Sequence, residues 1–380
     1  MRSTLTLHQP LIVIAIVSLL LPNYSHANTS TSQYTEQQTT FLKAEEALKK
    51  NDLNRFNSLI KRLQNYPLYP DLLYKSMQRR VNQLSQSDID AFTQAFPGTR
   101  ATMRLQQEWL KNLARKKQWE TYLDNWQPTK NITLQCNYLN ALLNTGQQQK
   151  AFEEAKPLWL VSHSQNQECD SVFSAWQKSG GINSELIWQR IKLAMKAGNI
   201  SLASHLAKNL NKTDQHWVSL WKQAYKNPQF VLEKKKFLRN HSIRSTIFVS
   251  AIEKTSKKSG EHAAKLWEQL TVNYRFSTDE QARIKRAIAM AHVVDHHPDA
   301  LKWLANIPET HVDKEIRDWR IRMALRNENW EGARFWIEQL PINEKSSERW
   351  RYWYARALEA TGNSDSAQKH YKIAATSRDF

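Results

Sequence analysis

Apolar residues recur along the chain at the three- and four-residue spacing of amphipathic helices. The pattern starts near Thr40, where Phe41, Ala44, Ala47 and Leu48 would share one helix face. It then repeats in pairs: a helix ends in Gly, Asn or Lys-rich turn residues, and an Ala or aromatic residue soon opens a second helix that runs back. The clearest pairs are residues 141–146 leading to Ala151, residues 193–198 leading to Ala203, and residues 357–362 leading to Ala367.

These pairs predict helix hairpins. Gly tolerates the left-handed backbone conformation that ends a helix, and a small Ala at the crossing lets two helices approach closely. Looser versions occur at Gly260 with Ala263 and Ala264, and at residues 327–329 with Ala333. Because one hairpin cannot bury its apolar face alone, hairpins of about 34 residues stack into an α-solenoid. The turn glycines Gly146, Gly198, Gly260 and Gly362 are 52, 62 and 102 residues apart, which predicts an irregular solenoid.

Composition agrees with a helical fold. The 380 residues include only 8 Gly and 11 Pro, well below the usual shares of about 7% and 5% that turn-rich β folds need. No Gly/Ser-rich or Pro-rich stretch interrupts the helical pattern. We therefore predict an all-α chain with one extended helical domain over residues 40–380, preceded by a flexible N-terminal stretch over residues 28–39.

The first 27 residues have the pattern of a secretory signal peptide. Arg2 supplies the positive charge, residues 11–21 form an apolar run, and Ser25-His26-Ala27 offers a cleavage site. The run is shorter than the ~20 residues of a membrane span. We expect cleavage after Ala27, export, and no stable membrane insertion; the alternative is an uncleaved leader that anchors the chain.

Two cysteines, Cys136 and Cys169, lie 33 residues apart. In an oxidising compartment two such thiols are expected to join as a disulfide. The alternative is a pair of buried, unreactive thiols.

The sequence offers little catalytic chemistry. The Gly-rich phosphate-binding and nucleophile-elbow motifs are absent from the sequence, and we expect no cofactor. Neither Glu261-His262 nor His296-His297 has the spacing of a metal motif, so we expect no metal site. The helical carboxylates Glu108, Glu120, Glu268 and Glu338 lie among Lys, Arg or Gln residues, which is typical of solvated helix faces. No catalytic carboxylate is therefore assigned.

Basic and aromatic residues gather in the last quarter of the chain. The candidate substrate-binding residues are Arg317, Arg320, Arg322, Arg349, Arg351 and Arg356, with Arg326 and five tryptophans, Trp319, Trp330, Trp336, Trp350 and Trp353, beside them. Arg binds carboxylates in a bidentate manner and Trp offers a flat apolar face; the alternative places these tryptophans in the core. The net charge of +18, or +17 without Arg2, favours a polyanionic partner, and export disfavours nucleic acid.

Five segments, in this order, resemble the N-terminal superhelical region of soluble lytic murein transglycosylases. They are residues 66–74 (YPLYPDLLY), 109–119 (WLKNLARKKQW), 158–160 (LWL) with 169–176 (CDSVFSAW), 191–199 (IKLAMKAGN) and 349–356 (RWRYWYAR). The resemblance implies a periplasmic protein whose hairpins curve into a superhelical ring, followed by a linker and a lysozyme-like catalytic domain. In that family the catalytic domain cleaves the β-1,4 bond between N-acetylmuramic acid and N-acetylglucosamine without water, leaving 1,6-anhydro ends.

The family's catalytic Glu-Ser motif has no counterpart before Phe380. We therefore expect a region that engages peptidoglycan glycan strands as a monomer and is inactive alone, its catalytic domain being lost, separately encoded or outside this sequence. The alternative function is a periplasmic helical-repeat scaffold that binds a protein partner.

Overall fold

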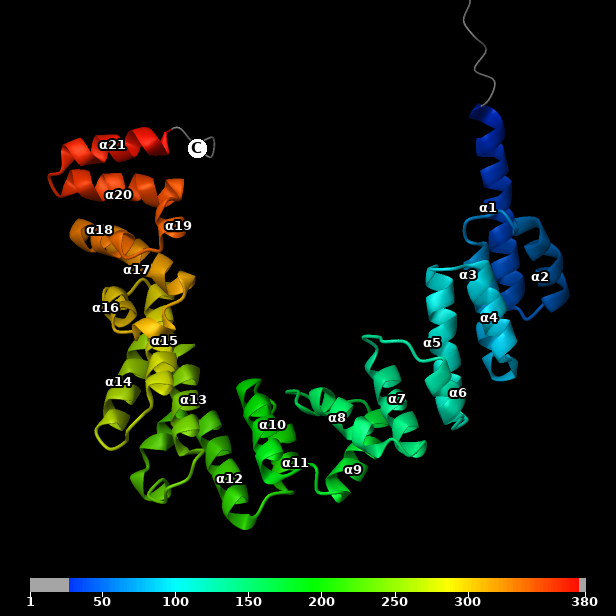
Figure 1. Ribbon diagram of the computed structural model, residues 1–380, viewed down its shortest axis with the longest axis horizontal. Coiled ribbons are helices and arrows are strands. Elements are labelled where there is room, and N and C mark those ends of the chain that lie inside the picture. Colours follow the sequence, from blue (N-terminus) through cyan, green and yellow to red (C-terminus); the bar gives the residue numbers. More distant parts are fainter. Residues whose placement is uncertain (1–26, 376–380) are drawn as a thin grey trace, which may run out of the picture. The chain divides into compact units, whose positions relative to one another are not determined.

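The computed structural model describes residues 27–375, and Figure 1 shows that these residues form helices joined by short turns. Over this range no β-strand is present, so the predicted all-α class is confirmed. None of the helices in residues 27–375 is long and apolar enough to cross a membrane. Apart from Ala27, the predicted leader lies outside the described residues.

The helical chain divides into two compact units, where the sequence predicted one extended domain. Unit 1 takes the described part of Met1–Glu153 together with Asn166–Val172, and unit 2 takes Glu154–Gln165 and the described part of Phe173–Phe380. The division falls inside two helices, α8 (Gln148–Trp159) and α9 (Asp170–Lys178). No Gly- or Pro-rich linker marks it in the sequence, which is why composition gave no sign of it.

Unit 1 contains the first seven helices and three short 3-10 helices. These are α1 (Ala27–Lys49), α2 (Leu53–Ile60), η1 (Lys61–Leu63), α3 (Tyr69–Arg79), η2 (Val81–Gln83), α4 (Gln86–Ala95), α5 (Arg100–Arg115), α6 (Trp119–Asp124), α7 (Ile132–Asn144) and η3 (Gln167–Cys169). Helix α1 begins at Ala27, not near Thr40, because residues 28–39 contain no Gly or Pro to stop it. The core side chains of α1 are nevertheless the predicted ones, Phe41, Ala44, Ala47 and Leu48, all of them buried.

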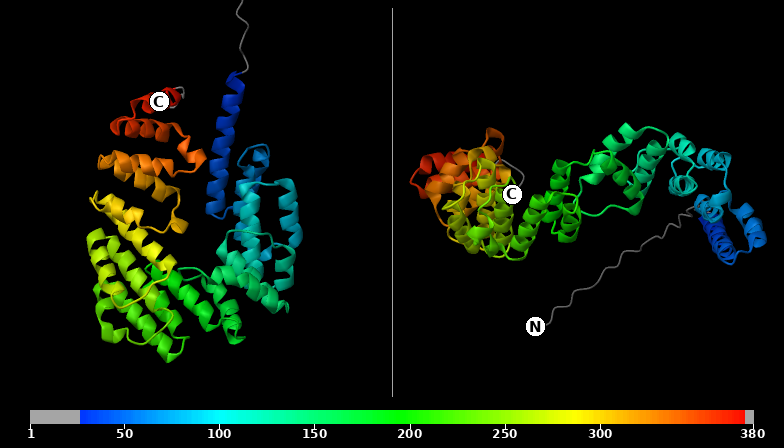
Figure 2. Two further views of the ribbon diagram at one scale, coloured as in Figure 1. Left: turned by 60° about the vertical axis from the view of Figure 1, so that its left-hand side comes forward. Right: turned by 90° about the horizontal axis from the view of Figure 1, so that it is seen from below.

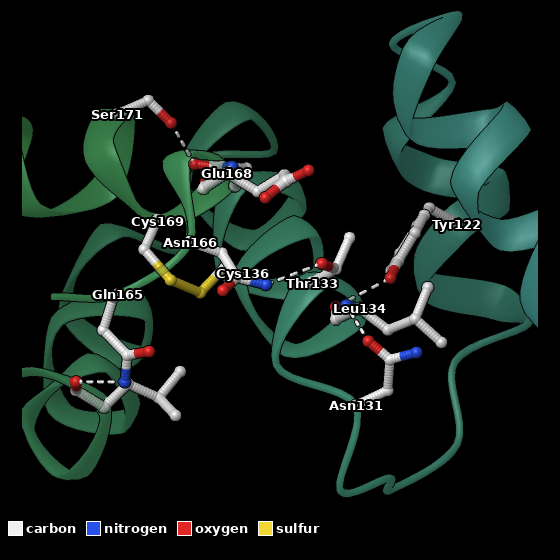
Figure 3. The surroundings of a disulfide bond; sticks show 12 residues. Tyr122, Asn131, Thr133, Leu134, Cys136, Gln165, Asn166, Glu168, Cys169 and Ser171 are labelled. Atoms are coloured by element: carbon white, nitrogen blue, oxygen red, sulfur yellow. Dashed lines mark hydrogen bonds between the residues drawn. A yellow bond between two sulfur atoms is a disulfide. The ribbon is translucent and has the colours of Figure 1, made fainter. Parts of the chain in front are cut away.

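A disulfide bond between Cys136 of α7 and Cys169 of η3 lies in the core of unit 1 (Figure 3). The Cα atoms of the two residues are 4.8 Å apart, and both side chains are fully buried. Two hydrogen bonds hold the same segment to α7: the Asn140 side chain donates to the Glu168 carbonyl at 2.7 Å, and the Asn166 side chain donates to the Thr133 hydroxyl at 2.9 Å. The disulfide therefore reinforces a contact that polar groups also make.

Unit 2 contains helices α10 to α21, which follow one another in space in sequence order (Figures 1 and 2). They are α10 (Ser184–Lys196), α11 (Ile200–Ala207), α12 (Lys212–Lys226), α13 (Arg244–Ser256), α14 (Gly260–Thr271), α15 (Thr278–Val294), α16 (Ala300–Ala305), α17 (Lys314–Arg326), α18 (Trp330–Glu338), α19 (Ile342–Lys345), α20 (Glu348–Ala360) and α21 (Ser364–Ala374). Three 3-10 helices join them: η4 (Pro228–Leu232), η5 (Lys234–Lys236) and η6 (Glu309–His311). Within each predicted hairpin of this unit a small Ala is buried at the start of the second helix: Ala203, Ala263, Ala333 and Ala367.

The hairpin turns share one backbone geometry, but only some of them use glycine. Gly198 and Gly362 have positive φ, as predicted, yet His296 and Glu328 take the same left-handed conformation with φ values of 53° and 52°. In each case the next residue donates a backbone hydrogen bond to the carbonyl five residues before it, as in Asn329 to Ala324 at 2.9 Å. Positions 296, 328 and 362 are 32 and 34 residues apart, so this part of unit 2 is more regular than its glycines suggest.

Gly260 does not close a helix. It is the first residue of α14, and its φ is not in the left-handed region. It is a glycine for a different reason: a Cβ atom there would lie 2.4 Å from Nδ1 of the buried His292. The close approach of α14 to α15 therefore explains this glycine.

Gly198 has a left-handed backbone conformation and also a close neighbouring side chain, which leads to the first prediction. Its φ is +81°, and an added Cβ would lie 2.7 Å from the Tyr225 hydroxyl oxygen. The Tyr225 ring is covered by the Lys254 ammonium group at 3.5 Å, which limits its freedom to move. We expect Gly198→Ala to lower the free energy of unfolding by about 2 kcal/mol. Urea unfolding followed by circular dichroism measures this difference in the free energy of unfolding.

Gly362→Ala is the matched control, because Gly362 has a φ of +84° and no atom within 4 Å of the added Cβ. Here only the backbone cost of about 1 kcal/mol applies. Equal losses for the two variants would contradict the role assigned to the Tyr225 contact.

Candidate functional site

The predicted basic residues lie on two neighbouring segments of unit 2. Arg317, Arg320 and Arg322 are on α17, whereas Arg349, Arg351 and Arg356 are on α20. Successive residues of a helix point about 100° apart, so these side chains face different surroundings. The structure separates them into residues that hold the fold, residues that line a pocket, and residues that lie outside it.

Arg317 holds α17 to the short helix α19. Its Nε and Nη2 atoms contact the two carboxylate oxygens of Glu344 at 3.1 and 2.5 Å, and its Nη1 donates to the Val312 carbonyl at 3.2 Å. The hydrogen bond from Arg317 lowers the pKa of the Glu344 carboxyl below its ordinary value of 4.5. Both side chains are mostly buried, so Arg317 serves the fold.

The Arg317–Glu344 pair predicts a pH-dependent stability. Because the pKa of Glu344 is lower in the folded chain than in the unfolded chain, its contribution is complete above about pH 4.5 and is lost as the pH falls through the folded-state pKa. We expect Glu344→Gln to lower the free energy of unfolding by about 1 kcal/mol at pH 7. The difference from the unmodified chain should shrink towards zero at pH 3 in urea unfolding.

Glu233→Gln is the control for this titration, because Glu233 is exposed and has no ion pair within residues 27–375. The effect of this variant should be within about 0.5 kcal/mol at pH 7. A loss for Glu344→Gln that stays constant between pH 7 and pH 3 would argue against the carboxylate as its cause.

Arg320 is the most buried of the six residues, with only 2% of its surface exposed. Its guanidinium donates to the carbonyls of Leu304 and Ile307 at 3.1 and 3.3 Å and to the Glu309 carboxylate at 2.8 Å. It also lies 4.4 Å from the centre of the Trp336 ring. Its donors are thus engaged inside the fold, and Arg320 is not placed to meet a ligand.

Arg322 and Arg349 come together at one carboxylate, that of Asp318. Arg349 donates to Asp318 at 3.4 Å, and the Arg322 guanidinium is 3.9 Å from the same oxygen. Each guanidinium lies over a tryptophan, Arg349 over Trp350 at 4.4 Å and Arg322 over Trp319 at 5.0 Å. Lys314 contacts Asp318 as well, at 3.2 Å. One carboxylate therefore faces three cations.

These two arginines line a pocket between α17, α18 and α20, which we call the Arg–Trp pocket. Its volume is about 460 Å³, and its main lining residues are Arg322, Arg326, Arg349, Trp330, Trp350 and Trp353. Leu325 and Glu328 complete the lining. The pocket thus combines guanidinium groups with flat apolar surfaces.

Arg326 is the pocket arginine that is not among the six candidate substrate-binding residues. It follows Arg322 by one helical turn, so the i, i+4 spacing on α17 could have indicated that the two share a face. Within residues 27–375 its side chain has no carboxylate in ion-pair distance, and it is exposed.

Arg351 and Arg356 lie on α20 but outside the lining of the Arg–Trp pocket. The Nε of Arg351 donates to the Ser346 carbonyl at 2.8 Å. Arg356 contacts the Glu359 carboxylate at 2.6 Å, and the Tyr371 hydroxyl donates to the same carboxylate at 2.8 Å. These two residues are better suited as controls than as parts of one site with the others.

The pocket offers guanidinium groups and aromatic faces that can bind a ligand, and none of the carboxylates considered from the sequence lines it. Of the carboxylates considered from the sequence, Glu108 contacts Lys111 at 2.9 Å and Glu338 accepts from the Tyr354 hydroxyl at 2.9 Å, both on helix surfaces. Glu120 and Glu268 are exposed. In the part of the chain that the structure describes, no three His, Cys, Asp or Glu side chains gather as metal ligands would.

Comparison with known proteins confirms the resemblance that the sequence segments indicated. The soluble lytic murein transglycosylase of Escherichia coli strain K12 is 28% identical over 337 residues, which is 88% of this chain. That match takes in 52% of the relative, so the chain spans about half the length of the curated relatives it matches.

Solved structures agree. The lytic transglycosylase Slt of Pseudomonas aeruginosa matches with a TM-score of 0.77 and 28% identity over 88% of this chain and 54% of that one. The 70-kDa soluble lytic transglycosylase of Escherichia coli matches with a TM-score of 0.73 and 26% identity over 89% of this chain and 55% of that one. The irregular helical solenoid is thus shared with proteins of this kind.

One family model, described as Cucumovirus coat protein, matches residues 136–238. This range is less than half of the chain. Its helices have the same hairpin construction as the helices that follow. The match therefore carries no assignment of function.

Proposed function

We propose that this chain is the peptidoglycan-engaging helical region of a periplasmic lytic murein transglycosylase. The observation that carries the proposal is the match of 88% of the chain, in sequence and in fold, to proteins named soluble lytic murein transglycosylase. The family reaction, cleavage of the N-acetylmuramic acid–N-acetylglucosamine bond to 1,6-anhydro ends, belongs to the whole enzyme. This region holds glycan strands and does not cut them alone. The predicted curvature of its hairpins into a ring is part of the proposal.

Export to the periplasm is supported by two independent features. The leader pattern of residues 1–27 is that of a signal peptide. The Cys136–Cys169 disulfide suits an oxidising compartment, where such bonds form and persist.

Electrostatic attraction supplies the mechanism. The chain has 54 Lys and Arg against 36 Asp and Glu, and peptidoglycan carries peptides with free carboxylates. A surplus of positive charge raises the local concentration of such a polymer, and salt weakens the attraction because it screens exposed charges. Arg322, Arg326 and Arg349 supply exposed guanidinium groups for direct contacts.

Co-sedimentation of the purified chain with isolated sacculi tests the proposal. We expect binding at low salt, weakening as salt rises, and no release of anhydro-muropeptides. Absence of binding at low salt would overturn the proposal, and recovery of a stoichiometric protein partner from the periplasm, not displaced by free glycan, would favour the scaffold alternative. Release of anhydro products by the pure chain would overturn its assignment as non-cutting.

A further inference from the structure

The Arg–Trp pocket has an excess of positive charge that the neighbouring carboxylates do not neutralise. Its lining carries three guanidinium groups and one carboxylate, Glu328, and Asp318 beneath Arg349 adds a second carboxylate. Lys314 also contacts Asp318, so four positive charges face two negative charges and a surplus of two remains. An anionic ligand would reduce this surplus, and a carboxylate offers the planar pair of oxygens that matches the fork of a guanidinium group.

The guanidinium groups retain donors for such a ligand. The contact of Arg349 with Asp318 occupies one of the five N–H groups of a guanidinium, and stacking on Trp350 fixes the plane of the group without using any. Arg322 is held over Trp319 in the same way. Arg326 has no ion-pair partner among the described residues. The pocket therefore presents oriented donors of the kind that bind carboxylates in a bidentate manner.

The apolar part of the lining limits which kind of molecule, bearing the negatively charged group, fits the pocket. Trp350 is buried and packs with Ile321, Ile337 and Leu340, while Trp330 and Trp353 are only partly buried. The pocket volume of about 460 Å³ lies in the range of about 300 to 1,000 Å³ that is usual for small-ligand sites. A sugar ring or a short peptide end next to the charged group fits both requirements.

We propose that the Arg–Trp pocket binds a free carboxylate of peptidoglycan, with Arg349, Arg322 and Arg326 on the carboxylate and Trp353 and Trp330 against the body that carries it. This inference rests on the proposed function and adds a defined site to it. Two sources offer the same chemistry: the lactyl carboxylate of N-acetylmuramic acid in peptide-free glycan, and the terminal carboxylate of a stem peptide. Asp318 positions the arginines in the free pocket.

Calorimetric titration of the whole chain with small probes tests the inference. N-acetylmuramic acid is compared with N-acetylglucosamine, which lacks the lactyl carboxylate, and D-alanyl-D-alanine is compared with its amide. We expect at least one acid to bind about tenfold or more tightly than its uncharged counterpart, and the pair that does so identifies the source. Equal binding within both pairs would overturn the inference, as would inorganic phosphate competing as strongly as the acid.

Variants on α20 give the matched comparison. Arg349→Ala should weaken binding of the acid about tenfold or more, and Trp353→Ala should weaken it several-fold. Arg351→Ala, two residues from Arg349 but outside the lining, should change it less than about twofold, with circular dichroism confirming that all three variants are folded. Equal binding by the Arg349→Ala and Arg351→Ala chains would overturn the inference.

Sacculus binding separates the two proposals. If the unmodified chain binds sacculi but none of the acids, the pocket inference fails and the proposed function stands. If the chain does not bind sacculi at low salt, the proposed function fails as well.

Discussion

Replacing both Cys136 and Cys169 with alanine will lower the free energy of unfolding of unit 1 by about 3 to 4 kcal/mol. The bond joins residues 33 positions apart, and opening it returns the loop-closure entropy to the unfolded chain. Both side chains are fully buried, so the loss of packing adds to the effect. The hydrogen bonds from Asn140 and Asn166 keep the η3 segment against α7 and limit the loss. Urea unfolding of the variant and of the oxidised chain gives the difference.

Reduction of the unmodified chain should have the same sign and about the same size, whereas dithiothreitol should leave the double variant unchanged. A thiol assay under denaturing conditions reports whether both cysteines are free. An unfolding midpoint that does not move although both thiols are free would contradict the prediction.

Replacing Arg320 with alanine will lower the free energy of unfolding of unit 2 by about 3 kcal/mol. The change removes the donor to the Ile307 carbonyl and the guanidinium that packs on Trp336. It also removes one donor from the Leu304 carbonyl, which keeps the backbone N–H of Ile307 at 3.3 Å. An unmatched buried acceptor costs about 1 to 3 kcal/mol, and the emptied volume adds to that cost. Glu309 is exposed, so the loss of its ion pair contributes little.

Arg326→Ala is the control for this prediction, because Arg326 is on the same helix and is exposed. The effect of this variant should be within about 0.5 kcal/mol. Urea unfolding followed by near-ultraviolet circular dichroism compares the two variants. Equal stability of the Arg320→Ala and Arg326→Ala chains would show that the buried hydrogen bonds of Arg320 do not matter for folding.

The hairpins were predictable from the sequence because their apolar spacing and small Ala residues are local signals. Their period was not, because it was measured between the turn glycines alone. Asn51, Lys117, His296 and Glu328 take the left-handed conformation without being glycine, and each is followed by the same backbone hydrogen bond as in the glycine turns. The left-handed conformation costs only about 1 to 2 kcal/mol for an ordinary residue, so packing can impose it where the turn residue is not glycine.

The sequence indicated that arginines and tryptophans gather in this part of the chain, but not which of the arginines line the pocket. Spacing along α17 and α20 brings arginines and tryptophans to common faces, which is local information. The acceptors that engage Arg320 lie 11 to 16 residues away in the chain, and Glu344 lies 27 residues from Arg317. Contacts of that range depend on how hairpins stack, so the sequence could not separate the arginines of the fold from those of the pocket.

The Cys136–Cys169 disulfide also determines the effect of a single proteolytic cut in the loop that it closes. The segment between α8 and η3 includes the exposed residues His163 and Ser164, and exposed loop tips are where nicking concentrates. A break there lies inside the covalent loop that runs from Cys136 to Cys169, so the two fragments stay tethered. In an environment without reductant such a nicked molecule would migrate as one species, and damage at this exposed loop would not detach either end of the protein.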